Sequence, residues 1–425
     1  MAKAPDQIRL AAVQLMHGVL EERLSMAEMT GEFGPLDGME PAAKARAQRL
    51  ALSALRHMGK ADAIMKPLLR KHPPMDVRLV LYLGIVEMLE EGSAPHGVVS
   101  ACVDLLNMHP RTRSLGGLAN AVLRRASEYT PEQWQALEPT RMKGWLRGRL
   151  ESKLGRASVV SLEVAHAKPA PLDLTPKDGD AAKLADLLGG EALPQGSVRL
   201  QDAKQVSKLP GFDTGDWWVQ DAAAAMPAKL LNAQPGEKVA DICAAPGGKT
   251  MQLAAAGADV TALDISKSRL ARLDENLTRT KLKAEVQRGD FLTWTAGPFD
   301  AILLDAPCSA TGTLRRHPDL PHVRNGKDIK PLFELQAQMI DRAVDLLKPG
   351  GRMVYCTCSL LPEEGEDQLK GALERHADLS TEALSHEWIE DGWRDAQGGL
   401  RLRPDFWAER GGMDGFYIAY LRKSA

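Results

Sequence analysis

The chain has 425 residues, of which 44% are hydrophobic, 26% charged and 5% aromatic. This length and composition indicate a soluble globular protein with more than one domain and exclude an RNA-stacking platform built on many aromatic rings. The formal net charge of −2 excludes a global basic signature, so that any nucleic-acid surface must be local. We find neither a run of about 18 apolar residues nor a signal-peptide pattern, and we expect a cytoplasmic protein without a membrane segment.

Residues 1–135 are expected to form an all-helical domain. Apolar residues recur at helical spacing, as in Leu10, Val13 and Leu20. The segments 95–99 (Pro-His-Gly-Val-Val) and 118–124 (Leu-Ala-Asn-Ala-Val-Leu-Arg) resemble the helical domain of the antitermination factor NusB, which implies an RNA-binding module. Three single histidines of this region are expected to be structural or exposed to solvent, namely His17, His57 and His96.

Residues 136–215 are expected to hold linker helices and a small α+β domain. Six basic residues share one helical register, and they form either a solvated helix face or a stripe that contacts phosphates; the sequence leaves both interpretations open. These residues are Arg141, Lys143, Arg147, Arg149, Lys153 and Arg156.

Residues 216–425 alternate between short apolar runs and helical patterns. This alternation predicts βαβ units and a parallel, Rossmann-like α/β sheet. The expected strands end near Cys243, Asp264, Gln287, Asp305 and Tyr355.

The apolar run 301–304 ends abruptly in an acid, a proline and a thiol. Such a run predicts a strand that is buried on both faces. Because ligands bind at the carboxyl ends of parallel strands, we expect Asp305 and Cys308 at the mouth of a site.

A glycine-rich turn closes the first strand of this region. Gly247 and Gly248 allow the backbone to approach a ligand closely, and the helix that follows points free amides at it. The turn fits neither the dinucleotide fingerprint nor a P-loop. Asp264 is placed to accept the hydroxyls of a ribose and Asp290 an adenine amino group, although a single aspartate after a strand is more often a helix cap. Together these acids favour S-adenosylmethionine as the cofactor.

The cysteines give no sign of a disulfide framework or a metal site. Their odd number in a chain without a secretory signal disfavours disulfides, and the spacing of Cys356 and Cys358 lacks the partner pair of a zinc site. Cys356 is expected to be a small buried hydrophobe. The five cysteines are Cys102, Cys243, Cys308, Cys356 and Cys358.

Three ordered motifs resemble those of the Sun/Fmu family of RNA 5-methylcytosine methyltransferases. They are Cys-Ala-Ala-Pro-Gly-Gly-Lys at 243–249, Asp-Ala-Pro-Cys-Ser at 305–309 and Thr-Cys-Ser at 357–359. The tail 315–319 (Arg-Arg-His-Pro-Asp) and the segment 414–419 extend the resemblance over nearly the whole chain. It implies a Rossmann-like S-adenosylmethionine-dependent methyltransferase domain that methylates carbon 5 of a cytosine, with 16S ribosomal RNA as the expected substrate.

The resemblance also implies the roles of the site residues. Cys358 would attack carbon 6 of the base, Asp305 would hold the base edge, and Cys308 would assist product release. DNA 5-methylcytosine enzymes attack with the cysteine of the Pro-Cys pair instead, which leaves Cys308 as the alternative nucleophile. Lys249 and the two glycine amides would hold the carboxylate and sulfonium end of the cofactor. The complete predicted cofactor set is Cys243, Ala244, Ala245, Pro246, Gly247, Gly248, Lys249, Asp264, Asp290 and Asp305.

Two further expectations concern RNA. Arg315, Arg316 and basic residues after the second strand (Lys267, Arg269 and Arg272) could contact phosphates, and the alternative for any single one of them is a solvated side chain. The small domain has Leu-Asp-Leu-Thr at 172–175 where the family usually has Leu-Arg-Val-Asn, which argues against RNA contacts from this segment. We expect a monomer without a metal; the alternatives are the same chemistry on transfer RNA, and a non-catalytic ribosome assembly factor.

Overall fold

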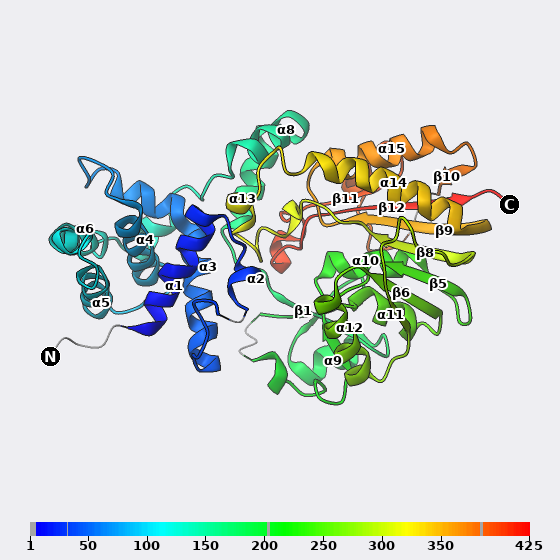
Figure 1. The fold of residues 1–425 in the computed structure, drawn as a ribbon, viewed down its shortest axis with the longest axis horizontal. Coiled ribbons are helices and arrows are strands. Elements are labelled where there is room, and N and C mark those ends of the chain that lie inside the picture. Colours follow the sequence, from blue (N-terminus) through cyan, green and yellow to red (C-terminus); the bar gives the residue numbers. More distant parts are fainter. Residues whose placement is uncertain (1–5, 32, 202–204, 383–385) are drawn as a thin grey trace. The chain divides into compact units, whose positions relative to one another are not determined.

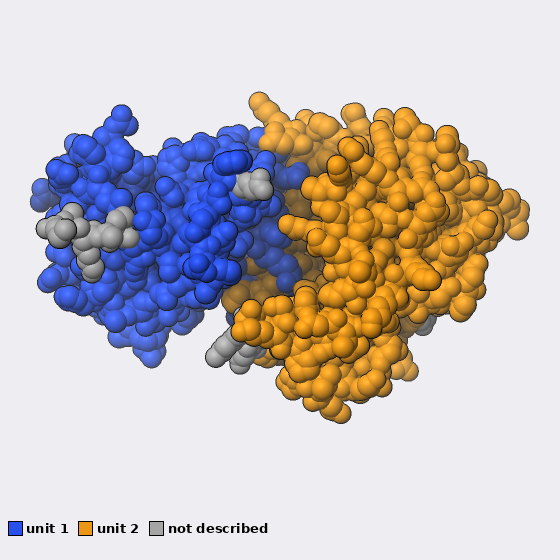
Figure 2. Space-filling model, turned by 60° about the horizontal axis from the view of Figure 1, so that its bottom comes forward, with its two compact units in different colours: residues 1–168, 316–325 blue, residues 169–315, 326–425 orange. Residues whose placement is uncertain are grey.

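The computed structural model describes residues 6–31, 33–201, 205–382 and 386–425. These residues form two compact units, one comprising the chain up to Lys168 together with 316–325, and the other comprising 169–315 and 326–425 (Figure 2). The division differs from the three expected segments, with boundaries at 135 and 215, because the helices up to residue 166 pack with the first unit. In the described part of the chain, no helix is long and apolar enough to cross a membrane.

The first unit is helical, as the apolar spacing predicts. Helix α4 forms the centre of the unit, because its own apolar side chains point in every direction around the helix axis. Val80, Leu81 and Ile85 are among its buried residues. His57 is buried beside Glu90, and burial lowers its pKa to about 3, so it is a structural histidine. The helices of the unit are α1 (Gln7–His17), α2 (Met26–Met29), α3 (Pro41–Met65), α4 (Met75–Leu89), α5 (Pro95–Asn107), α6 (Gly116–Ala126), α7 (Pro131–Gln135), α8 (Gly144–His166) and α13 (Leu320–Val323).

The expected basic stripe is partly neutralised within α8. Arg147 donates to Glu163, which is buried, and also contacts Glu151. Lys153 and Arg156 are exposed. Arg147 therefore forms hydrogen bonds with a buried carboxylate instead of facing a phosphate.

A segment from the second half of the chain, 316–325, packs into the helical unit. The backbone N–H of Met26 donates to the buried carboxylate of Asp319 at 3.0 Å, and the indole N–H of Trp145 donates to the carbonyl of Pro321 at 3.4 Å. The His-Pro-Asp part of the expected tail motif thus contributes to packing in this unit.

The second unit contains a small antiparallel sheet and a large mixed sheet (Figure 1). The small sheet has the order β2-β3-β1-β4 and is covered by α9, which confirms the expected α+β domain. Its elements are β1 (Leu172–Pro176), α9 (Ala181–Leu188), β2 (Glu191–Ala192), β3 (Val198–Leu200) and β4 (Trp217–Val219).

Asp173, the acidic residue that departs from the family pattern, has a structural role. Its carboxylate accepts both guanidinium hydrogen bonds from Arg199 at 2.7 Å, and neither side chain is exposed. Arg199 also donates to the carbonyls of Arg410 and Gly412. The bidentate pair therefore fixes β1 and β3 to the C-terminal part of the unit.

The large sheet has the order β10-β12-β9-β8-β5-β6-β7, and β11 pairs with β12. Strands β9, β8, β5, β6 and β7 run parallel, as predicted, whereas β12 is antiparallel to β9. Its elements are α10 (Ala222–Leu231), β5 (Lys238–Ile242), α11 (Gly248–Ala255), β6 (Asp259–Asp264), α12 (Lys267–Thr280), β7 (Glu285–Arg288), β8 (Phe299–Asp305), α14 (Lys330–Leu346), β9 (Leu347–Thr357), α15 (Glu366–Arg375), β10 (Leu379–Thr381), β11 (Leu400–Leu402) and β12 (Phe416–Lys423).

Strand β8 is buried on both faces, as its apolar run predicts. Leu303 packs in the core that includes Met226 of α10, whereas Leu304 packs in the core that includes Ile340 of α14. Successive side chains point to opposite faces of a strand, so that each core takes alternate residues. This double burial fixes β8 in register and holds Asp305 at its carboxyl end.

Candidate active site

The site lies where the strand order reverses. β5 pairs with β6 on one side and with β8 on the other, and both neighbours are parallel to it. At such a switch point the connections leave in opposite directions and open a crevice at the carboxyl ends of the strands. The glycine-rich loop after β5 and the Asp305 loop after β8 both begin there.

The glycine-rich loop is held tightly. Gly247 has φ of +103°, and a Cβ there would lie 3.0 Å from the side chain of Leu273, so the turn requires glycine. Asp264 accepts from the backbone N–H of Ala245 at 3.2 Å, and Arg269 donates to the carbonyl of Ala245. In the described contacts, Asp264 and Arg269 therefore support the loop.

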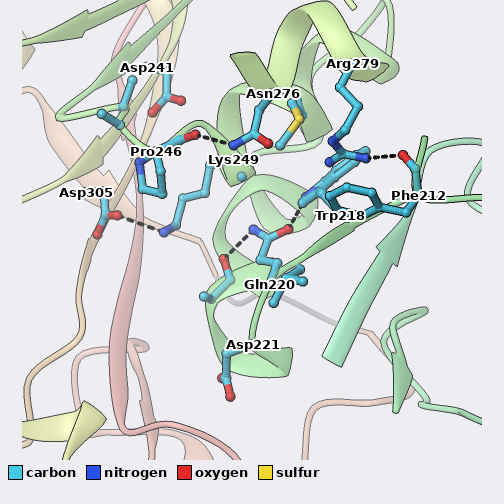
Figure 3. A pocket seen from close by; sticks show the side chains of 16 residues that line it. Phe212, Trp218, Gln220, Asp221, Asp241, Pro246, Lys249, Asn276, Arg279 and Asp305 are labelled. Atoms are coloured by element: carbon cyan, nitrogen blue, oxygen red, sulfur yellow. Dashed lines mark hydrogen bonds and ion pairs between the residues drawn. The ribbon is translucent and has the colours of Figure 1, made fainter. Parts of the chain in front are cut away.

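A cavity of about 320 Å³ opens beside this loop (Figure 3). Some of the predicted cofactor residues line it, and aromatic and polar residues of the small domain and α12 complete the wall. Lining residues that the sequence predicts are Ala244, Ala245, Pro246, Gly248, Lys249 and Asp305, whereas Asp241, Phe212, Trp218, Gln220, Asn276 and Arg279 were not predicted.

Lys249 and Asp305 form an ion pair on the wall of the cavity. The Lys249 ammonium lies 2.8 Å from an Asp305 carboxylate oxygen (Figure 3). It also lies 5.3 Å from the centre of the Phe416 ring. Burial alone would lower the pKa of Lys249, but the attraction of Asp305 outweighs it and raises that pKa. Lys249 is therefore positively charged although its side chain is mostly buried.

Asp241, on the cavity wall, has an incomplete set of polar contacts. Its side chain is fully buried; Thr250 donates to one carboxylate oxygen at 2.6 Å, and the other has no hydrogen-bond partner among the described residues. Burial raises the pKa of Asp241 to about 7. A buried oxygen of this kind, on the wall of a cavity, is suited to a ligand that carries a hydrogen-bond donor or a positive charge.

The two predicted thiols lie next to each other. The sulfur atoms of Cys308 and Cys358 are 3.4 Å apart, although the residues are separated by 50 positions in the chain. The hydrogen bond with Cys358 raises the pKa of Cys308, and burial raises it further. Cys308 is therefore a neutral thiol at neutral pH, able to donate to a thiolate on Cys358.

Cys356 is buried in the core, as the sequence predicts. Its thiol points at the second Asp305 carboxylate oxygen, at 3.6 Å, and burial raises its pKa. Asp305 thus contacts Lys249 and Cys356 at the same time. Both contacts hold its carboxylate in one orientation at the end of β8.

Several predicted residues lie outside the cavity wall. Asp290 is exposed and accepts from the backbone N–H of Leu292, which is the helix-cap or turn interpretation that the sequence left open. Gly247 and Cys243 shape the loop; Cys243 has φ of +62°, and burial raises its pKa. The cofactor roles of Cys243, Asp264 and Asp290 remain predictions.

The phosphate-contact prediction for Arg315 is wrong. Its side chain is buried, and the guanidinium donates to the carbonyls of Gly411, Met413 and Pro169. Arginine carries five donors, so one side chain can satisfy several carbonyls where irregular segments meet. The sequence could not reveal this, because the carbonyls belong to residues about 100 or more positions away.

No group of three or more histidine, cysteine or acidic side chains is arranged to hold a metal ion in the ranges that the structure describes. Three of the residues that sequence reasoning missed are polar and buried. Asp241, Gln220 and Glu364 belong to segments that read as strand, loop and turn, and only their burial singles them out.

Comparisons with known proteins agree with this geometry. The family described as "16S rRNA methyltransferase RsmB/F" matches residues 228–422, and the NusB family matches residues 6–128. Ribosomal RNA small subunit methyltransferase B of Salmonella newport is 35% identical over 451 aligned residues, which cover 99% of this chain and 100% of the relative.

Solved structures share the fold. The crystal structure of PH0851 has a TM-score of 0.73 and 22% identity over the whole of both chains. NSun6 from Pyrococcus horikoshii, solved with SFG, has a TM-score of 0.59 and 21% identity, covering 67% of this chain and 99% of its own.

The switch-point crevice, the glycine-rich loop and these similarities define the protein as an S-adenosylmethionine-dependent methyltransferase with a NusB-type helical domain. More narrowly, because a relative at 35% identity is matched over its full length, the chain belongs to the ribosomal RNA small subunit methyltransferase B family.

Proposed function

We propose that this protein transfers a methyl group from S-adenosylmethionine to carbon 5 of a cytosine in 16S ribosomal RNA, with Cys358 as the attacking thiolate. The observation that carries the proposal is the pair of sulfur atoms 3.4 Å apart at adjacent strand ends, beside the Asp305 carboxylate. A protein that only bound RNA would need no such pair.

The residues around the cavity suit the cofactor. Its amino acid part carries a positive ammonium group, and the free oxygen of Asp241 is a buried acceptor for it. Lys249 and the amides of 247–248 would hold its carboxylate, and Asp264 and Asp290 remain candidates for the ribose and adenine. When bound, S-adenosylmethionine supplies an electrophilic methyl group.

The protein's own residues would make carbon 5 of the base reactive. The Cys358 thiolate forms a bond to carbon 6, and the displaced electron pair makes carbon 5 nucleophilic. Asp305, held by Lys249, would orient the base edge, and a proton shared between its carboxyl group and the ring nitrogen would neutralise the negative charge that develops there. After methylation, carbon 5 loses its proton to a base, the sulfur–carbon bond breaks, and Cys358 leaves as a thiolate beside Cys308.

Cys358 is the better candidate for the nucleophile. The RNA family that the chain resembles attacks with the cysteine of its Thr-Cys-Ser motif, and a proton on the Cys308 sulfur, 3.4 Å away, can stabilise a thiolate on Cys358. We further propose that the chain acts in the cytoplasm as a monomer without a metal.

The test is methyl incorporation from labelled S-adenosylmethionine into naked 16S ribosomal RNA, with mass mapping of the modified nucleotide. We expect 5-methylcytosine with the wild type and none with Cys358→Ala, whereas Cys102→Ala, which removes a buried thiol of the helical unit, keeps activity. Transfer RNA is the competing substrate. Methylation of transfer RNA alone would favour that alternative, and binding without methylation of either RNA would favour an assembly factor.

A further inference from the structure

A buried carboxylate stands between the two thiol loops. Glu364 belongs to the short turn Pro362–Glu364 that follows the Cys358 loop, and its side chain is fully buried. Burying a carboxylate is costly unless hydrogen bonds compensate for the lost water. Its partners therefore indicate what the residue contributes.

On one side, Glu364 binds the loop that carries Cys308. The backbone N–H of Ser309 donates to one carboxylate oxygen at 2.8 Å, and the Ser309 hydroxyl donates to the other. Gln336 of α14 donates to the same carboxylate at 3.2 Å and to the carbonyl of Pro307 at 2.8 Å. Residues 307 and 309, on either side of Cys308, are thus fixed through one acid.

On the other side, the same residue binds the strand that carries Cys358. The backbone carbonyl of Glu364 accepts from the Thr357 hydroxyl at 3.0 Å and from the Tyr355 hydroxyl at 2.9 Å. Thr357 directly precedes Cys358. Glu364 therefore contacts a neighbour of each thiol.

Three hydroxyl groups join the loops directly. Those of Ser309, Thr311 and Ser359 lie 3.2 Å from one another, and all three side chains are buried. The backbone N–H of Gly312 also donates to the carbonyl of Cys358 at 2.9 Å. Since none of these groups is a predicted reacting atom, the network acts on the geometry of the thiols.

We propose that Glu364 is a positioning residue, which sets the separation of the Cys308 and Cys358 sulfur atoms by clamping both loops. The consequence for catalysis rests on the proposed function, but the separation itself does not. The pKa of Cys308 is raised by its contact with Cys358 and by burial, and to a smaller extent by the negative charge of Glu364.

The separation can be probed without RNA. The oxidant diamide takes two electrons and two protons from a pair of thiols, which become a disulfide while diamide becomes the hydrazine. This requires the sulfur atoms to approach from 3.4 Å to about 2 Å. Peptide mass spectrometry identifies the Cys308–Cys358 link and its rate of formation.

We expect Glu364→Ala to lower the rate of disulfide formation at least tenfold. Without the carboxylate, the backbone N–H of Ser309 loses its acceptor, and the two loops can move apart. Glu364→Gln should oxidise at or above the wild-type rate, since an amide can serve the same partners. Ser309→Ala, which keeps the backbone contact, should be intermediate, and it tests the network if Glu364→Ala does not fold. Asp367→Ala, an exposed acid nearby, should match the wild type.

In methyl transfer, Glu364→Ala should lower kcat at least tenfold with the Kd for S-adenosylmethionine unchanged, and Glu364→Gln should restore most of kcat. A folded Glu364→Ala or Ser309→Ala protein that forms the disulfide at the wild-type rate would overturn the proposal. If the variants change the oxidation rate while the wild type methylates no RNA, the positioning role stands and the proposed function fails.

Discussion

The two halves of the site differ in how completely their buried carboxylates, Glu364 and Asp241, are paired. Around the thiols, Ser309, Thr311, Ser359 and Glu364 are buried and hydrogen-bonded to one another. Around the cavity, one oxygen of Asp241 is buried without a partner among the described residues. Covalent chemistry benefits from reacting groups held in a fixed geometry. A ligand-binding site, in contrast, needs polar groups that form their missing hydrogen bonds with the ligand.

The largest expected effect tests the fixed half. Cys308→Ala should accumulate a covalent RNA–protein adduct, because attack by Cys358 remains while release stalls, and turnover should fall by about 100-fold or more. A denaturing gel with labelled RNA measures the adduct. Cys356→Ala should give none, and neither should the double variant without Cys308 and Cys358. Retained turnover in Cys308→Ala without an adduct would remove Cys308 from the mechanism.

A smaller effect is expected in the open half. Lys249→Met removes the cation on the cavity wall and leaves Asp305 without its ion pair, so the Kd for S-adenosylmethionine should rise about tenfold, equivalent to about 1.4 kcal/mol. Isothermal titration calorimetry measures this change. Lys348→Met is a matched control, since Lys348 pairs with Asp300 at the other end of the parallel strands. The Kd of this variant for S-adenosylmethionine should equal that of the wild type. Equal affinities of both variants would exclude Lys249 from cofactor binding.

The smallest effect concerns stability and pH. The pKa of Asp241 is about 7 in the folded protein and about 3.9 in an unfolded chain, so the folded state binds the extra proton. Its contribution to stability is fully present below pH 4 and is lost as the pH rises to 7, at about 1.4 kcal/mol per pH unit. The free energy of unfolding of Asp241→Asn, relative to that of the wild type, should therefore increase from pH 4 to pH 7 and stay constant above pH 7.

Urea unfolding followed by tryptophan fluorescence at a series of pH values measures this difference. Asp178→Asn is a suitable control, because Asp178 is exposed and paired with Lys183, so the difference should be nearly independent of pH above pH 5. A difference for Asp241→Asn that does not vary between pH 5 and 7 would show that the buried carboxyl keeps an ordinary pKa.

The sequence by itself determined the alternation of strands and helices, the helical first domain, and the burial of Cys356. These follow from local patterns, because periodicity reports which side of an element is buried. The ordered motifs also placed Asp305, Cys308 and Cys358 at strand ends, and the sheet brings them together as expected.

Only the tertiary structure decided how the remaining polar residues are used. Arg315 could face RNA or the protein interior, and the carbonyls that enclose it come from residues 169, 411 and 413. No sequence pattern singled out Glu364, yet its carboxylate accepts from the backbone N–H of Ser309, which is 55 positions away. A charged side chain carries no local sign of its partner, since its burial depends on which distant segments the fold brings against it.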